Sequence, residues 1–460
     1  MRVYFDITDI VEYARSNPRV SGIQRVQARV ISSLGRLLGP EHVRCTFCDE
    51  RSGQLYEFDP RSVFTSHEFD SQMILFKLGQ LEDAGRLPDK REIKRYLSRY
   101  QDRKMLRALK KLQIYATALL RPDALPSMGI RHPRKPPGLE LAPLTPLSNL
   151  AVEDVFVFLG SNWTFPGALN FGKSHFHRGG VVVQMIYDII PFKTPEHCTP
   201  EQVAFFKRFL EQIPTYANAF LAISEWSRTD FLDYLHGRGI EREVVTVPLA
   251  HELDGFARNE RHTAPSDPTL TKLLASPFVL CVGTLESRKN GRALLDVWAR
   301  MLAEGEPKVP QLVFAGKVGW KTEAFFDQLK HNALLRNKVT LLNAPSDQDL
   351  AFLYQNCAFS AYPSFYEGWG LPVGEAAWFG KHVIASSATS LPEVCGDLID
   401  YIDPANLDDL HAKVVQAIRH PERLTERMQR IRCAPLRTWD EVAKSVYDAI
   451  SNQARSSAAA

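Results

Sequence analysis

Two glutamates lie eight residues apart in the segment Pro363–Glu375, with a glycine-rich turn between them. Glu367 precedes the turn and Glu375 follows it. The glycines of the turn permit backbone angles that residues with a Cβ avoid, and Pro372 suits a first helical position because its missing N–H has no intrahelical partner there. We therefore expect a strand, a tight loop and a helix whose first N–H groups form a site for an anion.

The elements on either side of this turn follow from the apolar pattern. The run Cys357–Tyr362 predicts a buried strand, and Val373–Phe379 predicts a helix that ends at Gly380. Glu367 would then lie in the loop and Glu375 in the first helical turn, so that both carboxylates face one ligand that carries hydroxyl groups and phosphates. Taken alone, Glu375 is more simply a capping or dipole partner of its helix.

A second segment offers the positive charge that a phosphate needs. Gly283–Asn290 reads Gly-Thr-Leu-Glu-Ser-Arg-Lys-Asn and follows the apolar run Phe278–Gly283. Arg288 and Lys289 therefore stand at the carboxyl end of an expected strand. Arg binds phosphate oxygens in a bidentate manner there, and Lys supplies a compact charge. An Arg-Lys pair on a protein surface is also commonly without any function.

Short apolar runs alternate with helical patterns along both halves of the chain, which is typical of α/β folds with doubly wound, mostly parallel sheets. In the C-terminal half the expected strands are Phe278–Gly283, Gln311–Ala315, Val339–Leu342, Cys357–Tyr362, His382–Ala385 and Asp400–Asp403. In the N-terminal half they are Arg2–Ile7, Asp154–Leu159, Val181–Tyr187, Ala219–Ile223 and Val244–Pro248.

Composition marks a linker between the two halves. Residues 255–272 are polar and contain Pro265 and Pro268. We expect an N-terminal domain over residues 1–254 and a C-terminal domain over residues 273–437. Ligands of open α/β sheets bind beyond the carboxyl ends of the strands, so two such domains facing each other would form a cleft.

Four positions in the N-terminal half are candidates for the other wall of that cleft. Gly22 lies where a loop becomes a helix, so the backbone can approach a sugar or phosphate closely, and Arg25 follows in the same turn. Asp188 directly follows the apolar run Val181–Tyr187, and a charged residue at the end of such a strand needs a structural or functional explanation. Such an Asp usually caps the next turn, and the alternative is contact with a substrate. Trp163 belongs either to the core or to a platform for a sugar.

Residues 88–137 form a basic insert, with fourteen Lys and Arg against four Asp and Glu. This local net charge of +10 leaves −7 for the rest of a chain whose total is +3. The insert fits two interpretations equally, an amphipathic surface on an anionic membrane or a solvated helix that covers the core. Its apolar residues at helical spacing are Ile93, Tyr96, Leu97, Tyr100, Leu109, Leu112, Ala116 and Leu119.

Composition also bounds the class of protein. The chain has 460 residues, 45% of them hydrophobic and 24% charged, which favours a globular protein of about two domains. The net charge gives no argument for nucleic acid binding, and no carboxylate or histidine cluster has the spacing of a metal site. No run approaches the ~20 apolar residues of a membrane-spanning helix, and the opening strand argues against a cleavable signal. Seven cysteines, scattered singly apart from a structural Cys45 and Cys48 pair, indicate reduced thiols in a cytoplasm.

Pro363–Glu375 closely resembles the E-x7-E signature of retaining GT-B glycosyltransferases of family 4, the glycosyl transferases group 1. The resemblance implies a GT-B fold, in which two Rossmann-like domains face each other across a cleft and a final helix in residues 438–460 crosses back to the first domain. It implies transfer of a hexose from a nucleotide sugar with retention at the anomeric carbon. The matching segments, strongest between Phe278 and Asp403, include Gly283–Asn290, Lys381–Ser386 and Leu391–Gly396.

The resemblance also implies roles for individual residues. Glu375 would bind ribose hydroxyls, and Glu367 would bind a hydroxyl of the donor sugar. Positive groups would replace Mg²⁺, so the enzyme would need no metal and no cofactor, only the nucleotide sugar as its substrate. The diphosphate would be bound by the side chains of Arg288 and Lys289 and by backbone N–H groups near Gly370 and Leu371.

Two features depart from the family pattern. Many members have two glycines where this chain has Gly22, and the strand end that commonly carries His-Asp here carries Tyr187 and Asp188. Asp188 would accordingly face the acceptor or act as a base, while Tyr187 replaces a His that often contacts the transferred sugar. Ser224–Ser227 matches a common turn of the family and is equally a helix cap.

The variant Thr284-Leu-Glu-x-Arg-Lys-Asn is similar to bacterial polysaccharide mannosyltransferases. We therefore expect mannosyl transfer from GDP-mannose to a glycan or lipid-linked acceptor, with the acceptor on the N-terminal domain and the nucleotide sugar on the C-terminal domain. Such an enzyme would be cytoplasmic, on the inner face of the plasma membrane if residues 88–137 bind lipid. Glucosyl or rhamnosyl transfer on the same scaffold, a nucleotide-sugar 2-epimerase and a non-catalytic sugar-nucleotide sensor are the alternatives.

Overall fold

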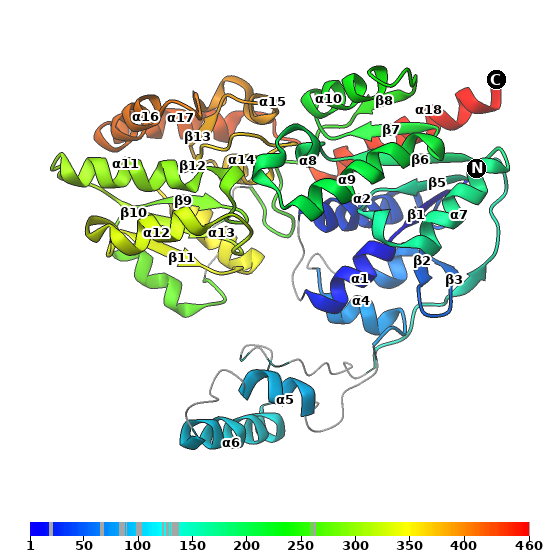
Figure 1. Ribbon diagram of the computed structural model, residues 1–460, viewed down its shortest axis with the longest axis horizontal. Coiled ribbons are helices and arrows are strands. Elements are labelled where there is room, and N and C mark those ends of the chain that lie inside the picture. The colour runs from blue at the N-terminus through cyan, green and yellow to red at the C-terminus, as the bar shows by residue number, and fades with distance from the viewer. Residues whose placement is uncertain are drawn as a thin grey trace.

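The computed structural model of the protein has two lobes, each built on one β-sheet, and a smaller third lobe of helices (Figure 1). The structure describes residues 1–460 except 18–21, 65–68, 82–87, 89, 98–103, 122–123, 126–127, 129, 131–137, 259, 261–263 and 460.

The first lobe contains an eight-stranded sheet in the order β4-β3-β2-β1-β5-β6-β7-β8. Its strands from β2 through β1 to β8 are parallel, while β3 pairs antiparallel with both β2 and β4. All five strands expected in this half are present within two residues of their expected ends, and β2, β3 and β4 are additional. The bounds are β1 Val3–Asp6, β2 Val43–Asp49, β3 Gln54–Phe58, β4 Thr145–Leu147, β5 Val155–Phe158, β6 Val181–Ile186, β7 Ala219–Ala222 and β8 Glu243–Thr246.

The second lobe contains a six-stranded, fully parallel sheet in the order β11-β10-β9-β12-β13-β14. All six strands were expected, within two residues of these ends, because strands buried on both faces read as continuous apolar runs. The bounds are β9 Phe278–Val282, β10 Gln311–Ala315, β11 Val339–Leu342, β12 Phe359–Tyr362, β13 Val383–Ser386 and β14 Asp400–Ile402.

Helices cover both faces of each sheet (Figure 1). In the first lobe they are α1 Thr8–Ser16, α2 Gly22–Leu38, α3 Pro60–Val63, α4 Ser71–Lys77, α7 Pro166–His177, α8 Ile190–Lys193, α9 Pro200–Gln212 and α10 Glu225–His236. In the second lobe they are α11 Gly291–Ala303, α12 Glu323–His331, α13 Asp347–Asn356, α14 Leu371–Trp378, α15 Leu391–Cys395, α16 Leu407–Arg419 and α17 Pro421–Cys433. Ser346 and Asp349 form a capping box at the start of α13.

The final helix, α18 (Trp439–Ala459), leaves the second lobe and packs on the first (Figure 1). Its buried side chains, among them Val442 and Ile450, join the same hydrophobic cluster as Val30 of α2. The crossing expected from the family resemblance is thus present. The helix continues to Ala459.

The basic insert contributes α5 (Lys90–Leu97) and α6 (Lys104–Leu120), which form the third lobe, apart from both sheets (Figure 1). These helices pack on each other around a small hydrophobic cluster of their own, so the interpretation as a helix that covers the core is wrong. Leu109, Leu112, Ala116 and Leu119 are exposed, and Tyr100 lies outside the described residues. Among the helices that the structure describes, none is both long and apolar enough to span a membrane.

Candidate active site

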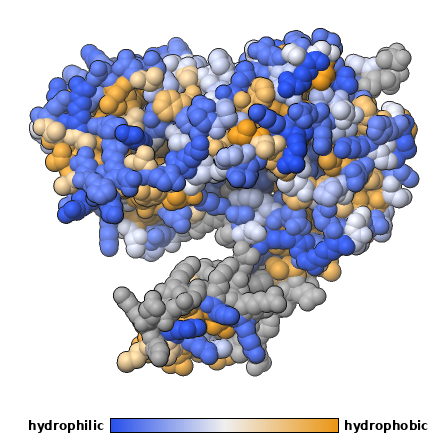
Figure 2. All heavy atoms as spheres, in the orientation of Figure 1, coloured by the Kyte–Doolittle hydropathy of each residue, from blue (hydrophilic) through white to orange (hydrophobic). Residues whose placement is uncertain are grey.

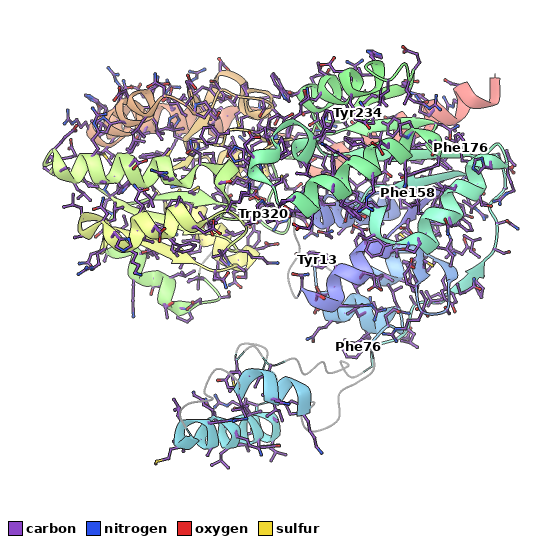
Figure 3. All side chains as sticks on the ribbon, viewed as in Figure 1. Tyr13, Phe76, Phe158, Phe176, Tyr234 and Trp320 are labelled. Carbon is purple, nitrogen blue, oxygen red and sulfur yellow. The ribbon has the colours of Figure 1, made fainter. Side chains whose placement is uncertain are left out.

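A cavity of about 660 Å³ lies between the two lobes. Its walls come from the start of α2, the end of β6, the loops after β9, β10 and β12, and the first turns of α13 and α14. Tyr13 and Trp320, from different lobes, lie beside the boundary between the lobes (Figure 3). Every candidate that the family motifs place at the site lines this cavity, namely Gly22, Arg25, Tyr187, Asp188, Arg288, Lys289, Glu367, Gly370, Leu371 and Glu375.

Helix α14 begins two residues earlier than expected. Gly370 is its N-cap, with φ of +121°, a backbone angle that favours glycine, and the helix has no side-chain cap. Leu371 is the first helical residue and Pro372 the second, so Glu375 lies in the second turn and not in the first. The uncapped N-terminus still presents backbone N–H groups and the positive end of the helix dipole to the cavity.

Glu367 is held by both cations of the Gly283–Asn290 segment. Its Oε1 accepts a hydrogen bond from Lys289 Nζ at 2.6 Å, and its Oε2 accepts one from Arg288 Nη1 at 2.9 Å. Arg288 also contacts Glu286 at 2.6 Å. Burial alone would raise the pKa of Glu367, but Arg288 and Lys289 hold that pKa at about 2. The carboxylate is therefore ionised at all physiological pH values.

Backbone contacts fix the loop that carries the cations against the loop that carries Glu367. Arg288 and Lys289 form a short 3-10 turn, which ends at Asn290 in the left-handed conformation. The Asn290 side chain donates to the carbonyl oxygens of Pro363 at 3.1 Å and Pro404 at 3.0 Å, and the Arg288 carbonyl accepts from the N–H of Phe365. These bonds preorganise the charged cluster and explain how segments far apart in sequence keep a fixed geometry.

Glu375 is fixed by groups from both lobes. Tyr354 donates its hydroxyl to Oε2 at 2.9 Å, and Arg25 Nη1 contacts Oε1 at 3.2 Å. Arg25, from α2 of the first lobe, also binds Asp347 at 2.6 Å. Burial raises the pKa of Glu375, and Arg25 and Tyr354 oppose that rise. Arg25 therefore connects the two lobes at the edge of the cavity.

The end of β6 approaches the turn of the second lobe closely. Asp188 Oδ1 accepts from the backbone N–H of Ile190 at 2.9 Å, which is the capping role, while the residue also lines the cavity. Burial raises the pKa of Asp188. Tyr187 donates its hydroxyl to the Leu159 carbonyl at 2.8 Å. A Cβ at Gly368 would collide with the Tyr187 carbonyl, so glycine is required for this approach.

A family model described as "Glycosyl transferases group 1" matches residues 268–432, which include the loops of Arg288, Glu367 and Glu375. The matched part of the chain, residues 268–432, belongs to the group 1 glycosyltransferases. The same segments carried the resemblance in the sequence, so that prediction of the family is confirmed.

Relatives of this chain include bacterial mannosyltransferases. The chain is 31% identical over 266 residues to the O-antigen chain mannosyltransferase B of Escherichia coli, covering 57% of this chain and 65% of that protein. It is 32% identical over 241 residues to a serotype-specific mannosyltransferase WbdA of the same species, covering 51% of this chain and 29% of that protein. The chain thus spans less than two thirds of the length of these relatives.

Among solved structures, the chain resembles Anabaena Alr3699/HepE in complex with UDP, with a TM-score of 0.52 and 15% sequence identity. The match covers 100% of this chain and 98% of that chain. At this identity the likeness concerns the fold, and it confirms the expected GT-B class of two α/β domains.

Sequence reasoning assigned no role to three charged residues of the cavity wall, Glu286, Lys317 and Asp347. Lys317 follows β10 as Arg288 follows β9, and its Nζ donates to Tyr13 Oη at 3.2 Å and Asn17 Oδ1 at 3.1 Å across the lobes. The position after a strand end was a signal that could have identified it. Asp347 lies in the first turn of α13, and Glu286 contacts Arg288.

Two N-terminal candidates lie away from the cavity lining. Trp163 is partly buried and packs against Phe209 in an aromatic cluster at the edge of the core, away from the cavity between the lobes. Ser224 caps α10, and the Ser224 and Ser227 hydroxyls both donate to the Gly368 carbonyl, so they hold the turn in place. Within the described part of the chain, no group of three or more His, Cys, Asp or Glu side chains is arranged to hold a metal ion.

Proposed function

We propose that the protein is a retaining glycosyltransferase that transfers a hexose, preferably mannose from GDP-mannose, to a glycan or lipid-linked acceptor in surface polysaccharide synthesis. The observation that carries this proposal is the contact of Glu367 with both Arg288 and Lys289 beside the uncapped end of α14, in one cavity. Transfer breaks the bond between the anomeric carbon and a diphosphate oxygen, and the diphosphate leaves with the electron pair. Cations and N–H donors stabilise that developing charge.

The cationic side of the site is suited to hold a diphosphate and a sugar hydroxyl together. Lys289 carries three N–H donors, so its ammonium can bind Glu367 and a phosphate oxygen at the same time. Arg288 offers a planar fork that matches phosphate geometry. In this proposal these side chains and the N–H groups at Gly370 and Leu371 supply the positive charge, and catalysis proceeds without Mg²⁺.

The carboxylates would orient the rings on either side of the diphosphate. Tyr354 and Arg25 hold the two oxygens of Glu375, so a ribose would meet an oriented acceptor group. Glu367 would accept from a hydroxyl of the transferred sugar. Asp188, buried on the first-lobe side of the cavity with a raised pKa, would receive the proton from the attacking acceptor hydroxyl. The cavity volume lies within the usual range for small-molecule sites.

The choice of mannose rests on relatives that are mannosyltransferases and that align with more than half of this chain. Glucosyl and rhamnosyl transfer would use the same charged groups. A nucleotide-sugar 2-epimerase would act on the donor without an acceptor, and a sensor would bind the donor without turnover. These alternatives therefore differ in their products rather than in the geometry of the site.

The first experiment identifies the donor. Purified protein is mixed with GDP-mannose, UDP-glucose or dTDP-rhamnose, and the melting temperature is measured with each. A donor at about 100 times its Kd adds about 2.7 kcal/mol to the free energy of unfolding, which is readily detected. We expect GDP-mannose to give the largest rise. A larger rise with another sugar nucleotide would overturn the mannose assignment and leave the transferase assignment in place.

The second experiment identifies the reaction. Radiolabelled donor is incubated with a membrane lipid extract or an oligomannoside, with and without EDTA, and the anomeric configuration of the product is read by NMR. We expect labelled acceptor, an α-linked product from an α-linked donor, and the same rate in EDTA. Epimerised donor without labelled acceptor would support the epimerase, and binding without any product would support the sensor.

A further inference from the structure

Helix α6 presents a row of large apolar side chains to solvent. The row lies on one face, because the positions 105, 109, 112 and 119 are spaced by four, three and seven residues. The opposite face carries Ile114 and Ala118, which are buried in the core of the third lobe. The exposed fractions are 83% for Met105, 61% for Leu109, 68% for Leu112, 64% for Leu119 and 81% for Leu120.

The fold of the third lobe does not require this outer row. The α5 side chains Ile93, Tyr96 and Leu97 fill the small core together with the inner face of α6. Single exposed apolar residues are common on protein surfaces, but five large ones on one helix face form a contiguous patch. Such patches mark interaction sites. In Figure 2, hydrophobic side chains lie at the surface of the described part of this lobe next to hydrophilic ones.

The charge of the two helices indicates which partner fits. Over residues 104–120, α6 has four Lys and Arg and no Asp or Glu, and over residues 90–97, α5 has four Lys and Arg and one Glu. Arg107 and Lys111 are exposed on α6. Two copies of α6 packed through the row would hold their cations on the outer faces, so it is the net charge of +4 on each helix that opposes self-association. An anionic lipid bilayer offers both a negative surface for the cations and an apolar interior for the row.

We propose that the third lobe docks on an anionic lipid bilayer, with α6 in the plane of the surface. Met105, Leu109, Leu112, Leu119 and Leu120 would enter the boundary between head groups and acyl chains, while the Lys and Arg side chains of α6, which lie on its other faces, add longer-range attraction to the anionic surface. This corrects the face expected from sequence, because Ile93, Tyr96 and Leu97 are turned inward and only the α6 row is available. The proposal concerns attachment and is independent of which sugar the cavity binds.

Vesicle flotation of the full chain tests this proposal. The vesicles contain phosphatidylcholine either alone or with about one third phosphatidylglycerol, at about 50 mM and about 500 mM NaCl. We expect flotation with the anionic vesicles at low salt and little with the neutral ones. Replacing two exposed cations, Arg107→Gln with Lys111→Gln, should weaken binding at low salt by about fivefold to thirtyfold, since a cation contributes about fivefold at the membrane surface and less at a distance from it.

The apolar row has its own variant and a matched control. Leu109→Ser with Leu112→Ser should weaken vesicle binding by about a hundredfold, because two leucine side chains lose their burial in lipid. Leu274→Ser with Leu334→Ser removes two exposed leucines from the second lobe and should leave binding unchanged. Circular dichroism establishes that each variant retains the helical content of the parent.

Three results would overturn the proposal. The first is a parent protein that stays off anionic vesicles at low salt. The second is a folded Leu109 and Leu112 variant that floats as well as the parent does. The third is a dimer, measured by light scattering without lipid, that the same substitutions dissociate, because the row would then be an interface between copies of this chain.

Discussion

The charge cluster at Glu367 makes stability depend on pH in a predictable way. Arg288 and Lys289 lower the pKa of this buried carboxyl from its ordinary value of 4.5 to about 2. The depressed pKa means that the ionised form is favoured by folding. The stabilisation is therefore fully present above pH 4.5 and is lost as the pH falls toward 2. Glu367→Gln removes the titrating group and keeps the shape of the side chain.

The magnitude follows from the two pKa values. A shift of this size corresponds to about 3 kcal/mol of unfolding free energy at neutral pH, since one pKa unit is about 1.4 kcal/mol. Because the side chain is buried, this value needs no large correction for solvent screening. Between about pH 5.5 and about pH 3.5, the wild type should lose about 1.3 kcal/mol that Glu367→Gln does not lose.

Urea denaturation followed by tryptophan fluorescence at both pH values measures the difference. For each protein, the change in unfolding free energy between the two pH values is determined. The change for the variant is then subtracted from the change for the wild type. Glu323→Gln, at an exposed position in the first turn of α12, is the control and should change with pH as the wild type does. If the unfolding free energies of the wild type and of Glu367→Gln change by the same amount between these pH values, the cations do not hold Glu367 as the geometry implies.

Two further predictions concern the proposed reaction. Lys289→Ala should lower kcat by about a hundredfold or more, because one preorganised donor to the leaving group is lost. The control Lys330→Ala, on an exposed helix end, should leave kcat unchanged. Near-normal turnover of Lys289→Ala at saturating donor would refute the role of Lys289. Glu375→Ala should raise the Kd for the nucleotide sugar by about tenfold or more through the loss of a charged hydrogen bond. Calorimetric titration measures that Kd, and an unchanged value would contradict contact with ribose.

The parallel strands other than β2 could be predicted from the sequence because each is an apolar run bounded by turn residues. The strands β2 and β3 were missed, since polar residues such as Thr46, Asp49 and Glu57 interrupt their apolar pattern. The strand β4 lies at the edge of the sheet and is largely exposed, so periodicity identifies it less well.

The sequence also identified which charged residues share the site but not how they pair. Glu367 meets Lys289 because bonds from Asn290 hold two loops together, and Arg25 meets Glu375 because two lobes close on each other. Neither contact has any local signal in the chain. In α6 the periodicity allows two apolar faces, and only the packing of α5 decides which one is buried.

The crossing of α18 has a consequence for how the protein is made. Val442, Val446 and Ile450 lie in the hydrophobic cluster that α2 shares with the first sheet, yet they are translated after the whole second lobe. Domains usually fold one after another as the nascent chain leaves the ribosome. Here the lobe that is synthesised first cannot complete its hydrophobic packing until α18 has been translated. Until then, an apolar groove along α2 is open to water.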